Sequence, residues 1–355
     1  MSATFKLNPV RLQAFAAQLF EAAGVPSPEA LIVAESLVES NLRGHHSHGV
    51  VRVSDYVQQI RSGELAAGAE LAVISETPSV LVAGAGFGFG QVQVRRLIER
   101  LLPKAREQGI ACGTMRDCGH VGRLGEWAEQ VADEKLAGLI TVNDNGVLQC
   151  VAPPGGTEPR ISTNPLAIGV PTSGEPMVLD ISTSAVANGK IHVAQLAGRQ
   201  CPPGWLQDAE GNPTTDPSVR FSDPPGTLLP MGGEHGYKGF GLGLMLDFLV
   251  GGLSGGFCPP SEPNAKISNN VLLVVWDPIR FAGNAHFVSQ VDELIEYVRR
   301  VPLKPGVDAI RLPSDHGNLS HRQGRVDGIS LDGGTWQELV HLAEELGVEV
   351  CSHEG

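Results

Sequence analysis

Basic residues and aromatic side chains are both scarce in this sequence of 355 residues. Lys and Arg number 26 against 39 Asp and Glu, so the formal net charge is −13 at pH 7. A surface that binds nucleic acid or an anionic membrane needs a basic stripe, and its lack leads us to expect neither partner. Long apolar runs are missing too, since the longest, 239–253, is too short for a bilayer and contains Asp247. We expect it to be a core helix.

The six cysteines form neither a CxxC motif nor an evenly spaced framework. Disulfide frameworks and zinc sites need cysteines in regular pairs, so this pattern indicates reduced, buried thiols. Cys118 and His120 are close in the sequence, but two ligands do not make a zinc site. The first fifteen residues lack the apolar segment of a secretory signal. We therefore expect a cytoplasmic protein without a bound metal.

Apolar residues recur with helical and strand periods in alternation along the chain. With 42% hydrophobic and 18% charged residues, the composition is that of an ordinary folded protein. The alternation predicts an α/β or α+β fold with a helical part at the N-terminus. The last helix is expected to start at Thr335, because Glu338 three residues later completes a capping box. Other helices are expected at 9–24, 28–43, 91–108, 238–253 and 288–300, and strands at 110–117, 137–144 and 270–276.

The segment "NLRGHHSHGVVRVSDYV", residues 41–57, contains a candidate catalytic pair. Valines at helical spacing predict a helix from about Ser47, which would place His48 and Arg52 on one face. An imidazole exchanges protons near neutral pH, and a guanidinium one turn away can hold a carboxylate with two hydrogen bonds. Such a pair suits reduction or oxidation of the carbon beside a carboxylate.

Two other interpretations of this segment remain open. His45, His46 and His48 could be surface histidines in a polar turn, with no role in chemistry. They could also bind a metal, although no matching His or Cys pair at ligand spacing occurs elsewhere in the sequence.

The glycine cluster "GAGFGFG", residues 84–90, lies between a predicted strand and a predicted helix. A Rossmann phosphate loop needs G-x-G-x-x-G in that position. Here the third glycine is replaced by Phe89 in one register and by Gln91 in the other. We interpret the cluster as a simple glycine turn.

A second glycine-rich segment, "GGEHGYKGFGLGLMLDFL", begins a predicted buried helix. Glycines there leave backbone N–H groups open at a helix N-terminus, which favours anions, and Lys238 could reach a diphosphate. The alternative is a core helix packed through its glycines, with an incidental lysine. The sequence alone leaves both open.

Seven motifs occur in one order along the chain. They are "SHGVVR", "GHVGRLGEWAE", "APPGG", "STNPLAIGVP", "LDISTSAVANGKI", "GWLQDAEGNPTTDP" and "GYKGFGLGLMLDFLVGGLSG". Together they resemble the malate/L-lactate dehydrogenase family of the second type, over roughly residues 10–345. That family includes ureidoglycolate, sulfolactate and diketogulonate oxidoreductases and the reductases of cyclic imines (piperideine and pyrroline carboxylates).

The resemblance implies a mixed α/β fold with a largely antiparallel sheet, a non-Rossmann site for NAD or NADP, and a homodimer. It implies a helical part at 1–75 with the catalytic histidine and arginine, joined by a C-terminal helix within 330–355. Residues 76–120 would form a small α/β segment at the substrate cleft. Residues 121–325 would form the nicotinamide-binding domain.

The resemblance also implies roles for single residues. Ser47 and His48 would be catalytic, and Arg52, His120 and Thr163 would contact the substrate. Lys190, after "ANG", would do so too, where the imine-reducing branch has an aspartate. The implied cofactor contacts are Asp180, Ile181, Ser182, Thr183, Ser184, Tyr237, Lys238, Pro313, Ser314 and Asp315.

These observations predict an NAD(P)-dependent oxidoreductase that interconverts a 2-hydroxy acid and a 2-oxo acid. Cyclic imine reduction is an alternative, disfavoured by Lys190. The "Pro-Ser-Asp" at 313–315 departs from the proline-glycine-glutamate usual in the family, which puts that cofactor contact in question. A non-catalytic protein that binds a metabolite or a metal is a more distant alternative.

Overall fold

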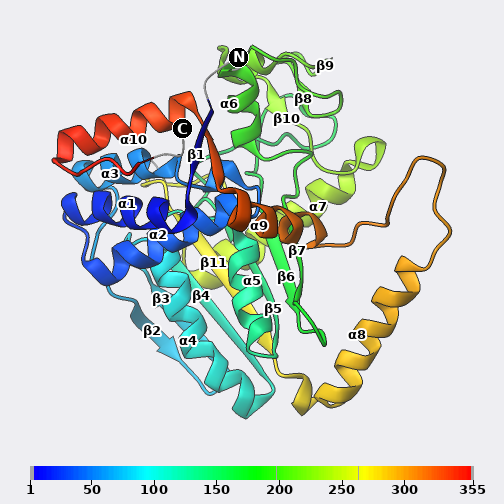
Figure 1. Ribbon diagram of the computed structural model, residues 1–355. Coiled ribbons are helices and arrows are strands. Elements are labelled where there is room, and N and C mark those ends of the chain that lie inside the picture. Colours follow the sequence, from blue (N-terminus) through cyan, green and yellow to red (C-terminus); the bar gives the residue numbers. More distant parts are fainter. Residues whose placement is uncertain (1–3, 197, 263, 353–355) are drawn as a thin grey trace.

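A seven-stranded sheet in the order β2-β3-β4-β11-β5-β6-β7 forms the centre of the fold (Figure 1). The computed structural model describes residues 4–196, 198–262 and 264–352. All neighbouring strands of this sheet pair antiparallel except β3 and β4, so the predicted mixed, largely antiparallel fold is confirmed. The strands are β2 (Ala72–Glu76), β3 (Val80–Gly84), β4 (Ile110–Cys118), β5 (Ala137–Asn143), β6 (Leu166–Val170), β7 (Met177–Ile181) and β11 (Asn269–Trp276).

Helices cover both faces of this sheet. Val271, Leu273 and Val275 of β11 are fully buried in one core with residues of α4 (Gly90–Gln108) and α5 (Leu124–Asp133). Alternate strand residues point to the other face. There Thr114 of β4 donates a hydrogen bond to the carbonyl of Leu253, in α7 (Tyr237–Ser254). None of the helices described is long and apolar enough to cross a membrane.

A layer of helices with its own core lies beside the sheet (Figure 1). Phe15, Phe20, Leu37, Tyr56 and Trp336 are buried together in it. The two ends of the chain close this layer, because β1 pairs antiparallel with β12. The elements are β1 (Thr4–Leu7), α1 (Pro9–Ala22), α2 (Ser27–Leu42), η1 (His46–His48), α3 (Arg52–Ser62), β12 (Ile329–Asp332) and α10 (Gly333–Leu346). The division at 1–75, 76–120 and 121–325 remains a proposal.

The remaining elements lie around the sheet edge that ends in β7. One of them, α8, stands away from the body in Figure 1, and none of its residues is buried. These elements are α6 (Asn188–Leu196), β8 (Leu206–Gln207), β9 (Pro213–Thr214), η2 (Pro217–Phe221), β10 (Thr227–Leu228), η3 (Gly233–His235), η4 (Pro278–Arg280), α8 (Asn284–Arg299) and α9 (Asp315–Asp327).

The continuous helix predicted from Ser47 is wrong. His48 ends the short 3-10 turn η1, and α3 begins only at Arg52. The cause is Asn41, whose amide oxygen accepts a hydrogen bond from the Val50 backbone at 2.8 Å. A Cβ on Gly49 would lie 2.1 Å from this oxygen, so only glycine allows the approach. The chain thus bends around Asn41 before α3 starts.

The start predicted for the last helix is also wrong. α10 begins at Gly333, and its N-cap is Asp332, not Thr335. The Asp332 carboxylate accepts hydrogen bonds from the backbone N–H of Thr335 at 3.0 Å and from its hydroxyl at 2.7 Å. An aspartate caps a helix as well as threonine does, and here it also ends β12.

The glycine turn at 84–90 packs against the loop after β4. The Ala85 and Phe87 amides donate to the carbonyls of Arg116 and Asp117, at 2.9 and 2.6 Å. A Cβ on Gly90 would lie 2.4 Å from the carbonyl oxygen of His120. These amides are used inside the protein and are not open to a diphosphate. The turn therefore serves close packing, as the failed Rossmann spacing indicates.

Candidate active site

His48 and His120 form a stacked pair of imidazoles. Their ring centroids are 5.2 Å apart and the rings are nearly parallel, at 8°. His48 comes from η1 and His120 from the loop between β4 and α5. Burial lowers the pKa of His48 to about 4, with smaller contributions from the charges of Arg52 and Arg123. Burial likewise lowers the pKa of His120 well below its ordinary value, so both rings are neutral at pH 7.

Arg52 reaches the same place from the first turn of α3. Its Nε donates to the carbonyl of Ser47 at 2.8 Å, and its Nη1 pairs with Asp55 at 2.9 Å. These contacts use two of the five N–H donors of a guanidinium, which leaves the others for a ligand. His48 and Arg52 therefore lie close together, as their spacing predicts, but a bend in the chain and not a continuous helix brings them there.

Further cations surround the histidine pair. The pKa of His45 is lowered to about 3, first by burial and then by Arg123, His48 and Lys190. Arg123 is 7% exposed, and its Nη2 pairs with Glu129 at 3.1 Å. The exposed Lys190 belongs to α6. The charges around these neutral rings are therefore mainly positive, as a site for an anionic substrate requires.

Ser47 lies at the edge of this cluster. A Cβ on Gly189 of α6 would be 3.3 Å from the Ser47 Cβ, so α6 and η1 are in close contact. Among the hydrogen bonds of the residues described, none joins the Ser47 hydroxyl to His48. The predicted serine–histidine pair is adjacent, and its role in proton transfer remains a prediction.

Two buried residues that the sequence did not single out hold His120. The Tyr56 hydroxyl lies 2.6 Å from His120 Nδ1, and Gln91 Nε2 donates to that hydroxyl at 3.0 Å. Burial raises the pKa of Tyr56 to about 12, so the phenol keeps its proton. Tyr56 is four residues after Arg52, and this helical spacing was the signal available in the sequence.

The segment predicted to contact the cofactor, from Asp180 to Ser184, begins with the last two residues of β7 and continues into the loop after it. Thr183 donates to the carbonyl of Thr163 through both its amide, at 3.0 Å, and its hydroxyl, at 2.9 Å. The Asp180 carboxylate accepts from the Gly125 amide at 2.8 Å, at the start of α5, and burial raises its pKa. The structure thus brings Thr163 and this segment together. Ile181 and Ser182 lie between Asp180 and Thr183 in this segment.

The first turn of α7 packs on the same segment. A Cβ on Gly239 would lie 2.8 Å from the carbonyl oxygen of Thr183, and one on Gly243 would lie 2.6 Å from its hydroxyl. Tyr237 and Lys238 begin the helix and are exposed. Glycine packing is therefore present in α7, and an anion site at Lys238 remains a prediction.

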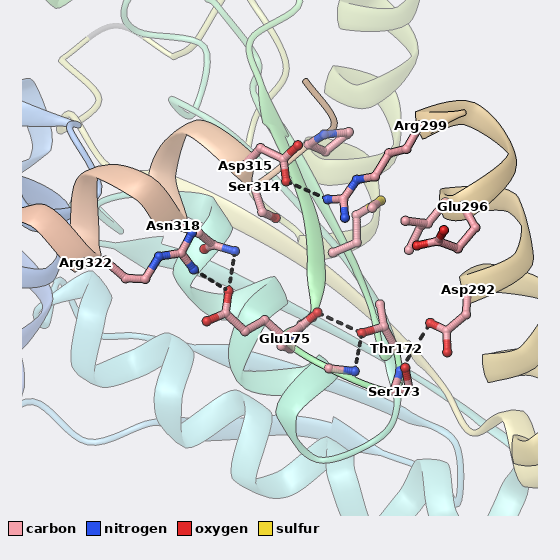
Figure 2. A pocket seen from close by; sticks show the side chains of 15 residues that line it. Thr172, Ser173, Glu175, Asp292, Glu296, Arg299, Ser314, Asp315, Asn318 and Arg322 are labelled. Atoms are coloured by element: carbon pink, nitrogen blue, oxygen red, sulfur yellow. Dashed lines mark hydrogen bonds and ion pairs between the residues drawn. The ribbon is translucent and has the colours of Figure 1, made fainter. Parts of the chain in front are cut away.

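The Pro313–Asp315 segment lies beside β7 and lines a cavity of about 480 Å³ (Figure 2). Ser314 takes a left-handed conformation, with φ of 73°, which explains why glycine suits this position. Its hydroxyl oxygen accepts from the Val178 amide at 2.6 Å and lies 3.1 Å from the Val178 carbonyl. These two contacts hold the serine in place despite the strain.

No group of three or more His, Cys, Asp or Glu side chains is placed to hold a metal ion within residues 4–196, 198–262 and 264–352. The one hydrogen bond of the histidine cluster to a neighbouring side chain joins His46 Nδ1 to Asn41 at 3.1 Å. His46 therefore supports the turn around Asn41.

Comparison with known proteins adds to this geometry. The family model described as malate/L-lactate dehydrogenase matches residues 7–340. The chain is 35% identical to a malate dehydrogenase of Pyrococcus horikoshii, over 96% of this chain and 95% of that protein. It is 34% identical to a Delta(1)-pyrroline-2-carboxylate reductase of Ancylobacter novellus, over 90% of this chain and 92% of that one.

Solved structures have the same architecture. The structure of malate dehydrogenase from Pyrococcus horikoshii superposes with a TM-score of 0.89 at 30% identity, covering 99% of each chain. A delta1-piperideine-2-carboxylate reductase from Pseudomonas syringae gives 0.83 at 30% identity, covering 95% of this chain and 99% of that one.

The low pKa of His48 can be measured by NMR titration of its imidazole. Because burial and nearby cations disfavour the charged ring, the proton should be lost as pH rises through about 4, and the ring should stay neutral at pH 7. Arg52→Gln removes one cation and should raise this pKa. A His48 that titrates at its ordinary pKa of about 6.5 would contradict the buried, cationic environment.

Proposed function

The chain belongs to the malate/L-lactate dehydrogenase family, and we propose that the cluster of His48, Arg52 and His120 is where it interconverts a 2-hydroxy acid and a 2-oxo acid. The observation that supports this site most strongly is the stacked imidazole pair surrounded by cations. Proton transfer needs an imidazole, and an anionic substrate needs fixed positive charge beside it. Both requirements are met at one place.

In this proposal each side chain has a distinct task. Arg52 holds the substrate carboxylate with its free N–H donors, which fixes the reacting carbon in orientation. The neutral His48 accepts the hydroxyl proton during oxidation and returns it during reduction. Lys190 and Arg123 add positive potential, and Ser47 orients His48. Thr163 contacts the substrate in this proposal, and its carbonyl accepts two hydrogen bonds from Thr183.

A nicotinamide cofactor supplies and accepts the hydride when it is bound. The residues around β7 fit such a group. Lys238 and the first amides of α7 offer positive charge to a diphosphate, and Asp180, which accepts a hydrogen bond from the Gly125 amide, belongs to the same proposed cofactor segment. Tyr237 is exposed beside Lys238 and can contact the same ligand.

The lining of the cavity at Pro313–Asp315 favours the binding of NAD over that of NADP. Figure 2 shows Arg299 directed at Asp315 and Arg322 directed at Glu175, and the N···O distances of these ion pairs are 3.0 and 3.5 Å. Asp292 and Glu296 add two more carboxylates to its lining. An acidic lining accepts hydrogen bonds from a ribose hydroxyl and repels a 2′-phosphate, which needs a free arginine.

Cyclic imine reduction is the second candidate, because a relative at 34% identity is named a pyrroline-2-carboxylate reductase. A protonated imine is a cation. Arg52, Arg123 and Lys190 around the histidines disfavour such a substrate relative to an uncharged oxo group.

Exposed apolar side chains on α7 and α8 support a homodimer. Met245, Phe248 and Leu253 on α7 are each more than half exposed. Phe248 is three residues after Met245, and the exposed Leu249 is four residues from both Met245 and Leu253, so these side chains share one apolar face. The isolated α8 also exposes Leu294 and Tyr297. A second copy of this chain would cover these faces, since apolar patches of this extent mark interfaces. We expect the protein to work in the cytoplasm.

The function is tested by NADH oxidation with pyruvate, oxaloacetate and pyrroline-2-carboxylate as substrates. The parent protein should reduce the 2-oxo acids in preference to the imine. His48→Asn should lower turnover by roughly two to four orders of magnitude, the usual contribution of a positioned acid or base. NADH binding, followed by its fluorescence, should be nearly unchanged. Turnover of the variant within a few-fold of the parent would remove His48 from the mechanism.

The cofactor preference is tested by comparing kcat/KM for NADH and NADPH. NADH should be favoured by about tenfold or more, which corresponds to roughly 1.4 kcal/mol. Glu175→Gln frees Arg322 and should narrow the preference. Glu158→Gln, which breaks the exposed Glu158–Arg160 pair elsewhere, is the matched control and should not. Equal use of both cofactors by the parent would refute the assignment.

Dimerisation is tested by sedimentation of the purified protein. The parent should sediment as a dimer, and Phe248→Asp should shift it toward monomer, because a charge would be buried in an apolar interface. Val10→Asp places the same charge on α1, where Val10 is 67% exposed, and should leave the dimer intact. A parent protein that is monomeric at micromolar concentration rules the proposal out.

A further inference from the structure

The two imidazoles of the cleft differ in what the protein does with their Nδ1 atoms. His120 Nδ1 lies 2.6 Å from the hydroxyl of Tyr56. His48 Nδ1 is buried and has no hydrogen-bond partner in the part of the chain that the structure describes. The tautomer of a neutral histidine is set by the hydrogen bond that one of its nitrogens makes. A hydrogen bond from the protein therefore fixes the tautomer of His120, whereas no such bond fixes the tautomer of His48.

The contact of Tyr56 with Gln91 determines the direction of the Tyr56–His120 hydrogen bond. Gln91 Nε2 is a donor only, and it lies 3.0 Å from the Tyr56 oxygen, which must accept. The phenol proton is then free to be donated, and His120 Nδ1 is the neighbouring atom that can accept it. Tyr56 and Gln91 are 2% and 0% exposed, so bulk water does not compete for these groups.

We infer that Tyr56, oriented by Gln91, fixes His120 as the tautomer protonated on Nε2, and that this N–H donates a hydrogen bond to an oxygen of the bound substrate. The substrate part of the inference rests on the function proposed above. Tyr56 is a positioning residue, because it acts through His120.

This arrangement gives the two stacked rings separate tasks. A neutral His120 whose Nδ1 is occupied presents a fixed donor, which stabilises negative charge that develops on a substrate oxygen during hydride transfer. His48, with no partner on Nδ1, can change its protonation state without breaking a hydrogen bond to the protein. Proton transfer and charge stabilisation are thus divided between the rings.

The tautomer is measured directly by nitrogen NMR of the protein labelled with ¹⁵N-histidine. In the parent, His120 should show a protonated Nε2 and a lone-pair Nδ1. Tyr56→Phe removes the donor and should give a mixture of tautomers. Ser62→Ala, which removes an exposed hydroxyl at the end of the same helix, is the matched control and should leave the His120 signals unchanged. A proton on Nδ1 of His120 in the parent overturns the inference.

Kinetics then separates positioning from packing. Tyr56→Phe should lower kcat/KM for a 2-oxo acid by about 10- to 100-fold, a usual cost of losing a side chain that orients a histidine. The dissociation constant of NADH should stay within about twofold, since Tyr56 contacts no residue of the proposed cofactor segment.

A double-mutant cycle uses His120→Gln, because the glutamine amide keeps an N–H donor near the position of Nε2 and has no tautomers. In this background Tyr56→Phe should have little further effect, since its action passes through the imidazole. If the loss of kcat/KM in the double variant equals the sum, in free energy, of the losses in Tyr56→Phe and His120→Gln, Tyr56 serves packing alone and the positioning role is overturned. A parent without activity on any 2-oxo acid refutes the proposed function and the substrate contact together, whereas the NMR result decides the tautomer by itself.

Discussion

The hydrogen bond from the Val50 amide to Asn41 determines where the proposed catalytic groups lie. It draws the chain between α2 and α3 around one buried side chain and forces the close approach that only Gly49 allows. His48 leaves this bend toward His120, whereas Arg52 begins the next helix. One amide therefore brings the proposed acid–base group, His48, and the proposed carboxylate-binding group, Arg52, together from two different elements.

The charged side chains near His45 and His48 are mainly positive, whereas the net charge of the whole chain is negative. The chain has a formal charge of −13, yet Arg52, Arg123 and Lys190 lower the pKa values of the central histidines. Arg123 is held by Glu129, which also pairs with Arg43, so one carboxylate is shared by two guanidiniums. Of these three cations Arg123 is buried, so salt screens its charge less than that of the exposed Lys190; exposed charges are screened over roughly 8 Å.

Local signals in the sequence predict part of this structure and miss what depends on distant contacts. Helical periodicity gives α1, α2 and α7, and the family resemblance gives the antiparallel sheet. Spacing predicts that His48 and Arg52 are neighbours, but through a helix that Asn41 prevents from forming. Gln91 holds Tyr56 from another helix, 35 residues away, and no local pattern links them. The polar α9 has no apolar stripe to reveal it, and the four-residue strands β1 and β12 exist only as a pair.

The pairing of β1 with β12 constrains the order in which the protein becomes functional. The helical layer that holds His48 and Tyr56 is closed by Trp336 of α10, which packs against Phe5 and Phe15. The apolar faces of the N-terminal helices are therefore covered in part by residues 329–346, more than 250 positions away in the sequence. Contacts between such distant parts of a chain form late and slowly. The layer that carries His48 and Tyr56 is thus one whose core is complete only when both distant segments have come together.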